Sequence, residues 1–119
     1  MKDNVVKDKS FAFAIKAVKL CKRLQEEQRE YVMSKQLLRS GTAIGALIRE
    51  SEHAESKANF IHKLSISLKE ANETEYWLLL LNETNYINEI ELTKLSNDLS
   101  ELLRLLTFII KTSKANRNP

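Results

Sequence analysis

The sequence predicts an all-α protein, folded as an antiparallel up-down four-helix bundle. The chain has 119 residues but only two glycines and one proline, so few positions favour a turn over continuous helix. Apolar side chains recur every three or four residues in four segments, as they do on the buried face of a helix. The connections between these segments are short, and short connections place consecutive helices antiparallel. A composition of 43% hydrophobic and 29% charged residues fits a single globular domain over residues 1–119.

The first helix is expected from about Ser10 to Glu30, after a flexible lead-in over residues 1–8. Two adjacent apolar stripes run along it, and this width predicts burial against more than one neighbour. One stripe comprises Phe11, Ala14, Val18 and Cys21, and the other comprises Phe13, Ala17, Leu20 and Leu24.

The second helix, from about Ser34 to Ala54, contains both glycines of the chain. Ser34 is the expected N-cap, because its hydroxyl can accept a free backbone N–H of the first turn. Gly41 and Gly45 are four residues apart and therefore lie on one face of the helix, the glycine face. Each glycine inside a helix costs about 0.5–1 kcal/mol relative to alanine, so we expect another helix to pack unusually close to this face.

The third helix is expected from about Ser56 to Asn82, and its stripe is small or polar in the middle. These small side chains suit a close approach to the glycine face. The segment 77–81 is apolar all round and is expected to be buried on several sides. The stripe comprises Phe60, Leu64, Ser67, Ala71, Thr74, Leu78 and Leu81.

The fourth helix is expected from about Glu91 to Lys111, followed by a flexible tail over residues 112–119. Like the first helix, it carries more apolar surface than four helices need to bury in one bundle. We therefore expect these two helices to contribute to an interface between subunits. The heptad stripe of the fourth helix comprises Leu92, Leu95, Leu99, Leu102, Leu106 and Ile109.

Charge is unevenly distributed along the chain, although the formal net charge is only +3. Residues 1–30 hold eight Lys or Arg against five Asp or Glu, whereas residues 69–95 hold two against six. The basic first helix and the acidic third helix are expected to attract each other, within one subunit or between subunits.

Several features favour a cytoplasmic protein without a membrane partner. The single cysteine, Cys21, excludes an internal disulfide and fits a reducing compartment. The N-terminus lacks the apolar segment of a signal peptide. The longest apolar run near the C-terminus, Leu102–Ile110, carries Arg104 and is shorter than the roughly 20 residues that cross a bilayer.

A contact between the second and third helices is expected at Arg39, one turn before the glycine face. Glu70, Glu73 and Trp77 share one face of the third helix and suit a partly buried arginine–carboxylate contact that fixes the register of the two helices. The alternative is that these are unrelated surface charges, which would contribute only about 0–1 kcal/mol.

A basic patch on the first helix is the candidate nucleic-acid interface. Its cations would bind phosphates by releasing counterions, and a ring of subunits would repeat them. The alternative is an ordinary solvated helix face. Aromatic residues do not interleave with these cations, so base stacking is not expected. The basic patch comprises Lys16, Lys19, Lys22, Arg23 and Arg29.

The residues do not indicate an enzyme, a cofactor or a small-molecule substrate. Glu50 and His53 form a Glu-x-x-His motif, but di-iron bundles need two such motifs and two further glutamates. Asn59 occupies the matching position before His62, so half of that metal site is missing. Cys21 has no histidine near it in sequence and is expected to be a buried structural thiol.

Two segments resemble a known protein family. They are SKQLLRSGTAIGALIRE, residues 34–50, and SKANFIHKLSISLKEANETEYWLLLL, residues 56–81. Both are similar to the bacterial four-helix-bundle proteins encoded within intervening sequences of large-subunit ribosomal RNA genes. Leu47 stands where the family is expected to carry Asn, and Asn59 where it is expected to carry an acidic residue. Contacts that those polar groups make in relatives are therefore not expected here.

The resemblance implies a ring-shaped homo-oligomer, often a pentamer. Distant relatives are the accessory proteins of diversity-generating retroelements, which bind RNA and a reverse transcriptase. The implied partners are further copies of this chain, together with structured RNA or an RNA-bound protein.

The sequence leaves three functions open. The first is a non-enzymatic, ring-forming accessory protein that binds RNA or a nucleoprotein through basic surface patches. The second is a purely structural or protein-interaction module without a nucleic-acid role. The third, which has the least support, is a metal-dependent enzyme.

Overall fold

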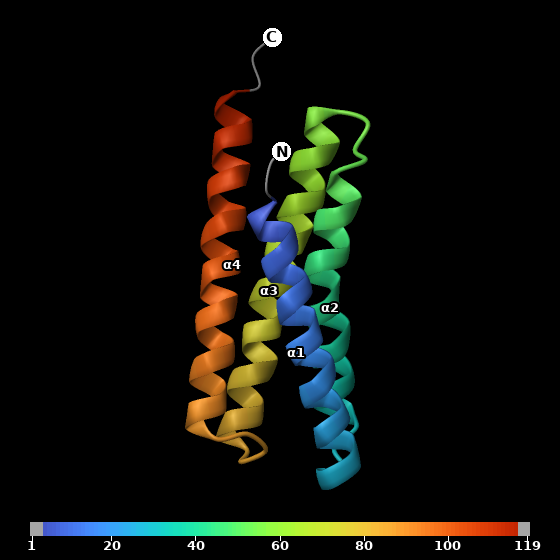
Figure 1. Cartoon of the computed structure of the whole chain (residues 1–119), viewed down its shortest axis with the longest axis vertical. Helices are drawn as coiled ribbons and strands as arrows, with labels where there is room; N and C mark the ends of the chain where they lie inside the picture. The colour runs from blue at the N-terminus through green and yellow to red at the C-terminus, as the bar shows by residue number, and fades with distance from the viewer. Residues whose placement is uncertain (1–3, 117–119) are drawn as a thin grey trace.

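The computed structural model describes residues 4–116, and this part of the chain folds into four helices without a strand (Figure 1). Consecutive helices run antiparallel, with the α2–α3 connection at one end of the bundle and the other two connections at the opposite end. The molecule is elongated, measuring 53 × 22 × 22 Å. The helices are α1 (Val5–Gln28), α2 (Val32–Ser51), α3 (Lys57–Glu83) and α4 (Glu89–Ala115).

Each helix packs against two neighbours, so α1 closes the bundle by lying beside α4. The pair α1 and α4 makes the fewest close backbone approaches of the four. The basic first helix and the acidic third helix are diagonal, and their backbones do not approach each other closely within the described residues. The expected attraction between them within one subunit is therefore not a direct contact.

Asparagine and serine side chains cap three of the helices. Asn4, Ser56 and Asn88 each accept a hydrogen bond from a backbone N–H of the first turn of α1, α3 and α4. The Asn4 amide and the Lys7 ammonium also bind Glu52, at 2.9 and 3.2 Å. Because of this anchoring, α1 begins well before the predicted Ser10.

The helix α2 is capped by a buried glutamate and not by Ser34. Glu30 is only 7% exposed, and its carboxylate accepts hydrogen bonds from the N–H groups of Val32, Met33 and Ser34 at 3.1, 2.9 and 2.7 Å. A carboxylate suits this place because the N-terminus of a helix carries a partial positive charge. Ser34 lies inside the helix, fully buried, and its hydroxyl donates to the Glu30 carbonyl at 2.8 Å.

The helices are longer at the chain ends than the sequence indicated. Residues 5–8 belong to α1 and residues 112–115 belong to α4, although both lie in segments predicted to be flexible. The rest of those two segments falls on residues 1–3 and 117–119, which lie outside the described part, and on Asn4 and Asn116, the caps of α1 and α4.

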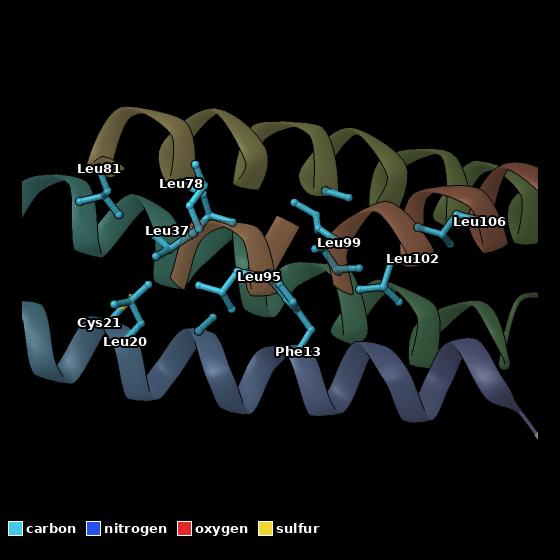
Figure 2. Packing of buried hydrophobic residues seen from close by; sticks show 14 of the residues in the cluster. Phe13, Leu20, Cys21, Leu37, Leu78, Leu81, Leu95, Leu99, Leu102 and Leu106 are labelled. Carbon is cyan, nitrogen blue, oxygen red and sulfur yellow. The ribbon is translucent and has the colours of Figure 1, made fainter. Parts of the chain in front are cut away.

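The core follows the predicted stripes closely along α3 and α4 (Figure 2). The predicted α3 stripe is buried from Leu64 to Leu81, whereas Phe60 is half-buried. In α4 the last buried position is Ile110, one residue beyond the predicted Ile109. The segment 77–81 was expected to be buried on several sides; Leu78 and Leu81 are buried, whereas Leu79 is 51% exposed.

Only one of the two apolar stripes of α1 is fully buried. Phe13, Ala17, Leu20 and Leu24 enter the core, as does Cys21 from the other stripe. Phe11 and Val18 remain exposed.

The glycine face packs mainly against α1, whereas the small residues of α3 had suggested α3. Thr74 of α3 reaches this face only at Gly41, where its Cγ2 would lie 3.9 Å from an added Cβ atom. A Cβ atom on Gly41 would lie 3.1 Å from the Ala17 Cβ, and one on Gly45 would lie 3.2 Å from the Ser10 hydroxyl. The small residues of α3 instead serve hydrogen bonds to α2. The Thr74 and Ser40 hydroxyls lie 2.9 Å apart, and the Ser67 hydroxyl donates to the Ile44 carbonyl at 2.9 Å.

Among residues 4–116, we find no helix with the length and apolar character needed to cross a bilayer.

Candidate nucleic-acid interface

The five cations of the predicted basic patch do not face one way. Lys16 and Arg23 point to α4, where each binds an acidic side chain. Lys22 lines the outer surface of α1 together with Val18, and Lys19 lies between these two directions. Arg29 is the C-cap of α1, in a left-handed backbone conformation with φ of 53°. The patch therefore divides into a part next to α4 and a part away from it.

Three ion pairs join α1 to α4 along their shared side. Lys9 pairs with Glu101 at 3.2 Å and Lys16 with Asp98 at 2.6 Å. Since Lys9, Lys16 and Arg23 are seven residues apart, they lie on one side of α1 at intervals of about 10 Å.

The third pair, between Arg23 and Glu91, is bidentate, with two hydrogen bonds of 2.7 Å each. The hydrogen bonds from Arg23 to Glu91 raise the pKa of the Arg23 guanidinium further above its usual value. This pair is the strongest of the three because both guanidinium nitrogens engage the carboxylate.

A groove follows these ion pairs between α1 and α4, and we call it the seam. Its central cavity has a volume of about 390 Å³, with Leu20 and Leu95 as its apolar floor. A cavity of about 200 Å³ continues the groove beyond the Lys16–Asp98 pair. A cavity of about 410 Å³ continues it beyond the Arg23–Glu91 pair, at the other end. The central cavity is lined by Lys16, Lys19, Leu20, Arg23, Glu91, Lys94 and Leu95.

Lys94 is a functional candidate that the sequence reasoning missed. It stands on the α4 wall of the central cavity, across from Lys19 on α1, and neither lysine makes an ion pair within residues 4–116. A basic patch is recognised in sequence by a density of cations along one helix, and α4 has no such density. The signal that could have identified Lys94 is its spacing in α4. It lies three residues after Glu91 and four before Asp98, and therefore on the same side of the helix as these two carboxylates.

An apolar stripe on α1 faces outward, and we call it the outer stripe. Phe11, Ile15 and Val18 are 54%, 42% and 38% exposed and line a shallow cavity with Lys19 and Lys22. The Arg49 guanidinium of α2 lies 5.4 Å from the centre of the Phe11 ring, a cation–π distance. The outer stripe is thus on the α2 side of α1, whereas the seam is on the α4 side.

The predicted contact at Arg39 is present. Its guanidinium donates to Glu70 at 3.1 Å and to Glu73 in a second, shorter hydrogen bond. Trp77 also donates to Glu73, at 3.0 Å, and these two donors, Arg39 first, hold the pKa of Glu73 below its usual range. The Arg39 side chain is 50% exposed, so the contact is more solvated than the sequence suggested.

The remaining reactive groups are occupied or isolated. Cys21 is buried, its thiol donates to the Ser34 carbonyl at 3.2 Å, and burial raises its pKa to about 11, so it stays protonated at neutral pH. Glu50 pairs with Lys63 at 2.9 Å, and His53 and His62 are exposed. Within residues 4–116, histidines, cysteines and carboxylates do not gather in threes where a metal ion would fit.

Comparisons with known proteins assign the family. The family described as 23S rRNA-intervening sequence protein matches residues 2–108. A crystal structure at 1.70 Å resolution, of a protein with unknown function from the S23 ribosomal protein family of Bacteroides thetaiotaomicron, is 59% identical in sequence. It superposes with a TM-score of 0.88 and covers 89% of this chain and 98% of its own. No curated protein matches the chain. This chain therefore belongs to the family of 23S rRNA-intervening sequence proteins.

Proposed function

We propose that this protein is a non-enzymatic, homo-oligomeric accessory protein that binds structured RNA, or an RNA-bound protein, through basic surface patches. The observation that carries the proposal is the division of charge among the helices. Helices α1 and α2 together hold nine Lys or Arg against four Asp or Glu, whereas α3 and α4 hold seven against eight. The family name adds a reason to choose RNA as the polyanion, since it links these proteins to a ribosomal RNA gene.

The proposed assembly is a ring of identical subunits, and the outer stripe supports it. Phe11, Ile15 and Val18 expose apolar surface that a second copy would cover. Further exposed apolar side chains lie on other helices, at Tyr76 and Leu79 of α3. Two different apolar faces on one chain favour a head-to-tail contact, and such a contact closes into a ring when the rotation allows. The free thiol of Cys21 fits a cytoplasmic location for this assembly.

Salt dependence of RNA binding tests the proposal. A structured RNA hairpin is titrated with the full chain at 50 to 200 mM salt while fluorescence anisotropy is followed, and the mass of the free protein is measured by light scattering. With about five phosphate contacts, we expect a slope of log K against log salt near −4, a loss of about 250-fold over this range. Absence of binding at 50 mM salt, or binding that salt does not weaken, would overturn the RNA role. A monomer in light scattering would overturn the ring.

A second candidate is a protein-interaction module without RNA. It is favoured by exposed apolar side chains outside the outer stripe, namely Ile90 and Phe108 of α4. In the same experiment it predicts an oligomer that binds no RNA at any salt concentration.

A further inference from the structure

We infer that the RNA backbone lies along the seam, where Lys19 and Lys94 contact phosphates first and where Asp98 and Glu91 compete with phosphates for Lys16 and Arg23. This inference rests on the proposed function and specifies its site. It differs from the patch expected on α1 alone, because it adds a residue of α4 and excludes part of α1.

The seam and the outer stripe lie on different sides of α1. Lys22 lines the cavity of the outer stripe, so a second copy seated there would cover it. The seam lies on the other side of α1, facing α4, and a neighbour on the outer stripe would leave it open. Lys19 borders both the outer stripe and the seam. The other seam cations do not line the outer-stripe cavity and remain available to RNA in the proposed ring, namely Lys9, Lys16, Arg23 and Lys94.

The seam carries more cations than carboxylates. Five cations line the seam, and three carboxylates pair with three of them. The two that are left, Lys19 and Lys94, stand on opposite walls of the central cavity. Cations on both sides of one groove fit an anion that enters it, and the apolar floor offers no competing polar group. The seam cations are Lys9, Lys16, Lys19, Arg23 and Lys94.

The ion pair between Lys16 and Asp98 can exchange its partner. The Lys16 and Asp98 side chains are 54% and 38% exposed, and exposed ion pairs contribute little to stability. A phosphate can therefore replace Asp98 at Lys16 with little loss of stability to the bundle. A single phosphate can bind only the two unpaired lysines. A chain of phosphates can also bind the other seam cations, which follow one another about 10 Å apart along α1. The seam thus favours an extended backbone over a free nucleotide.

Two variants in the seam, each with a control of equal charge change, test the inference. Lys94→Gln removes a cation from the seam, and Lys69→Gln removes one from the exposed surface of α3. Asp98→Asn removes a competing carboxylate, and Glu83→Gln removes an exposed one of α3. Lys69 and Glu83 make no ion pair within residues 4–116.

At 150 mM salt we expect Lys94→Gln to bind the RNA hairpin about fivefold more weakly than Lys69→Gln, with a salt slope smaller by about 0.9. We expect Asp98→Asn to bind about fivefold more tightly than Glu83→Gln, because one more cation becomes available. Light scattering and thermal melting confirm that each variant is assembled and folded. Should Asp98→Asn lower the melting temperature, Glu91→Gln replaces it as the test of carboxylate competition.

The outcomes separate the inference from the function on which it rests. If the wild-type protein binds RNA but each seam variant behaves as its control does, net charge alone acts and the seam is not the site. If the wild-type protein does not bind RNA at low salt, the proposed function fails and the inference fails with it.

Discussion

The two sides of α1 are held by different forces. On the α2 side, the glycine face brings backbones so close that a Cβ atom on Gly41 would stand 3.1 Å from Ala17. On the α4 side, the seam is a groove between the two helices, and partly exposed ion pairs join the helices across it. Close packing tolerates almost no change in volume, whereas an ion pair in water can exchange its partner.

This difference indicates how the bundle divides stability from binding. The contact of α1 with α2, together with the hydroxyl bonds between α2 and α3, fixes the arrangement of the helices. The seam contributes less to that arrangement, so its cations and carboxylates are available for a ligand. Mutations on the two sides should therefore produce separate effects, on melting temperature for one and on affinity for the other.

The largest expected effect is on the tightly packed side, from Gly41→Leu. The leucine side chain would meet Ala17 and Phe13, which are buried and cannot withdraw. Overpacking of this kind costs about 2–3 kcal/mol, and we expect the melting temperature to fall by roughly 10 °C. Differential scanning calorimetry measures the change.

Ala46→Leu is the matched control for Gly41→Leu, since Ala46 is exposed on the same helix. It should leave melting unchanged within about 0.5 kcal/mol. A Gly41→Leu protein that melts and assembles like its parent would show that the close approach to α1 does not determine the fold.

A smaller effect is expected where the chain turns from α1 into α2, from Glu30→Ala. Three backbone N–H groups would lose their buried acceptor, at a cost of about 2 kcal/mol. Glu30→Gln keeps an acceptor oxygen and should lose less, and Glu27→Ala, an exposed position, should lose almost nothing. Equal melting of the Glu30→Ala and Glu27→Ala proteins would assign the stability of this turn to other contacts. Chemical denaturation measures all three.

The fold was predictable because it depends on periodicity. The α3 stripe from Leu64 to Leu81 and the α4 stripe from Leu92 to Leu106 are buried as the spacing of their residues indicated. The start of α2 was not predictable from spacing, because serine is a preferred N-cap residue and the spacing does not show that Glu30 takes its place. The choice depends on which side chain folds back over the first turn, and that is a property of the α1–α2 connection in three dimensions.

The candidate site was predictable only in part. The density of cations on α1 identified Lys16, Lys19 and Arg23, which do line the seam. The sequence did not show that Lys16 and Arg23 are paired with α4, or that Lys94 stands opposite Lys19. Both facts require the register between two helices that are far apart in the chain. The glycine face shows the same limit, since its small residues indicated a close neighbour but did not identify which helix it is.

The smallest expected effect is at the solvated contact between α2 and α3, from Arg39→Ala. This variant tests whether an exposed ion pair helps to fix the register of α2 and α3. With Arg39 half exposed, we expect a loss of at most about 1 kcal/mol. The pKa of Glu73 is lowered in the folded protein from an ordinary value of 4.5, chiefly by Arg39. The contribution of the Arg39–Glu73 contact to the stability of the fold is therefore fully present above pH 4.5. It is lost as the pH falls through the lower pKa that Glu73 has in the folded protein.

Thermal melting of the wild-type and Arg39→Ala proteins should accordingly differ at pH 7 and converge in acid. Lys35→Ala is the control, because Lys35 is exposed on α2 and makes no ion pair within residues 4–116. If both variants melt alike at pH 7, Arg39 does not set the register of α2 and α3. The buried hydroxyl bonds at Ser40 and Ser67 would then hold that register alone, and ion pairs on both sides of the bundle would have the same minor role in stability.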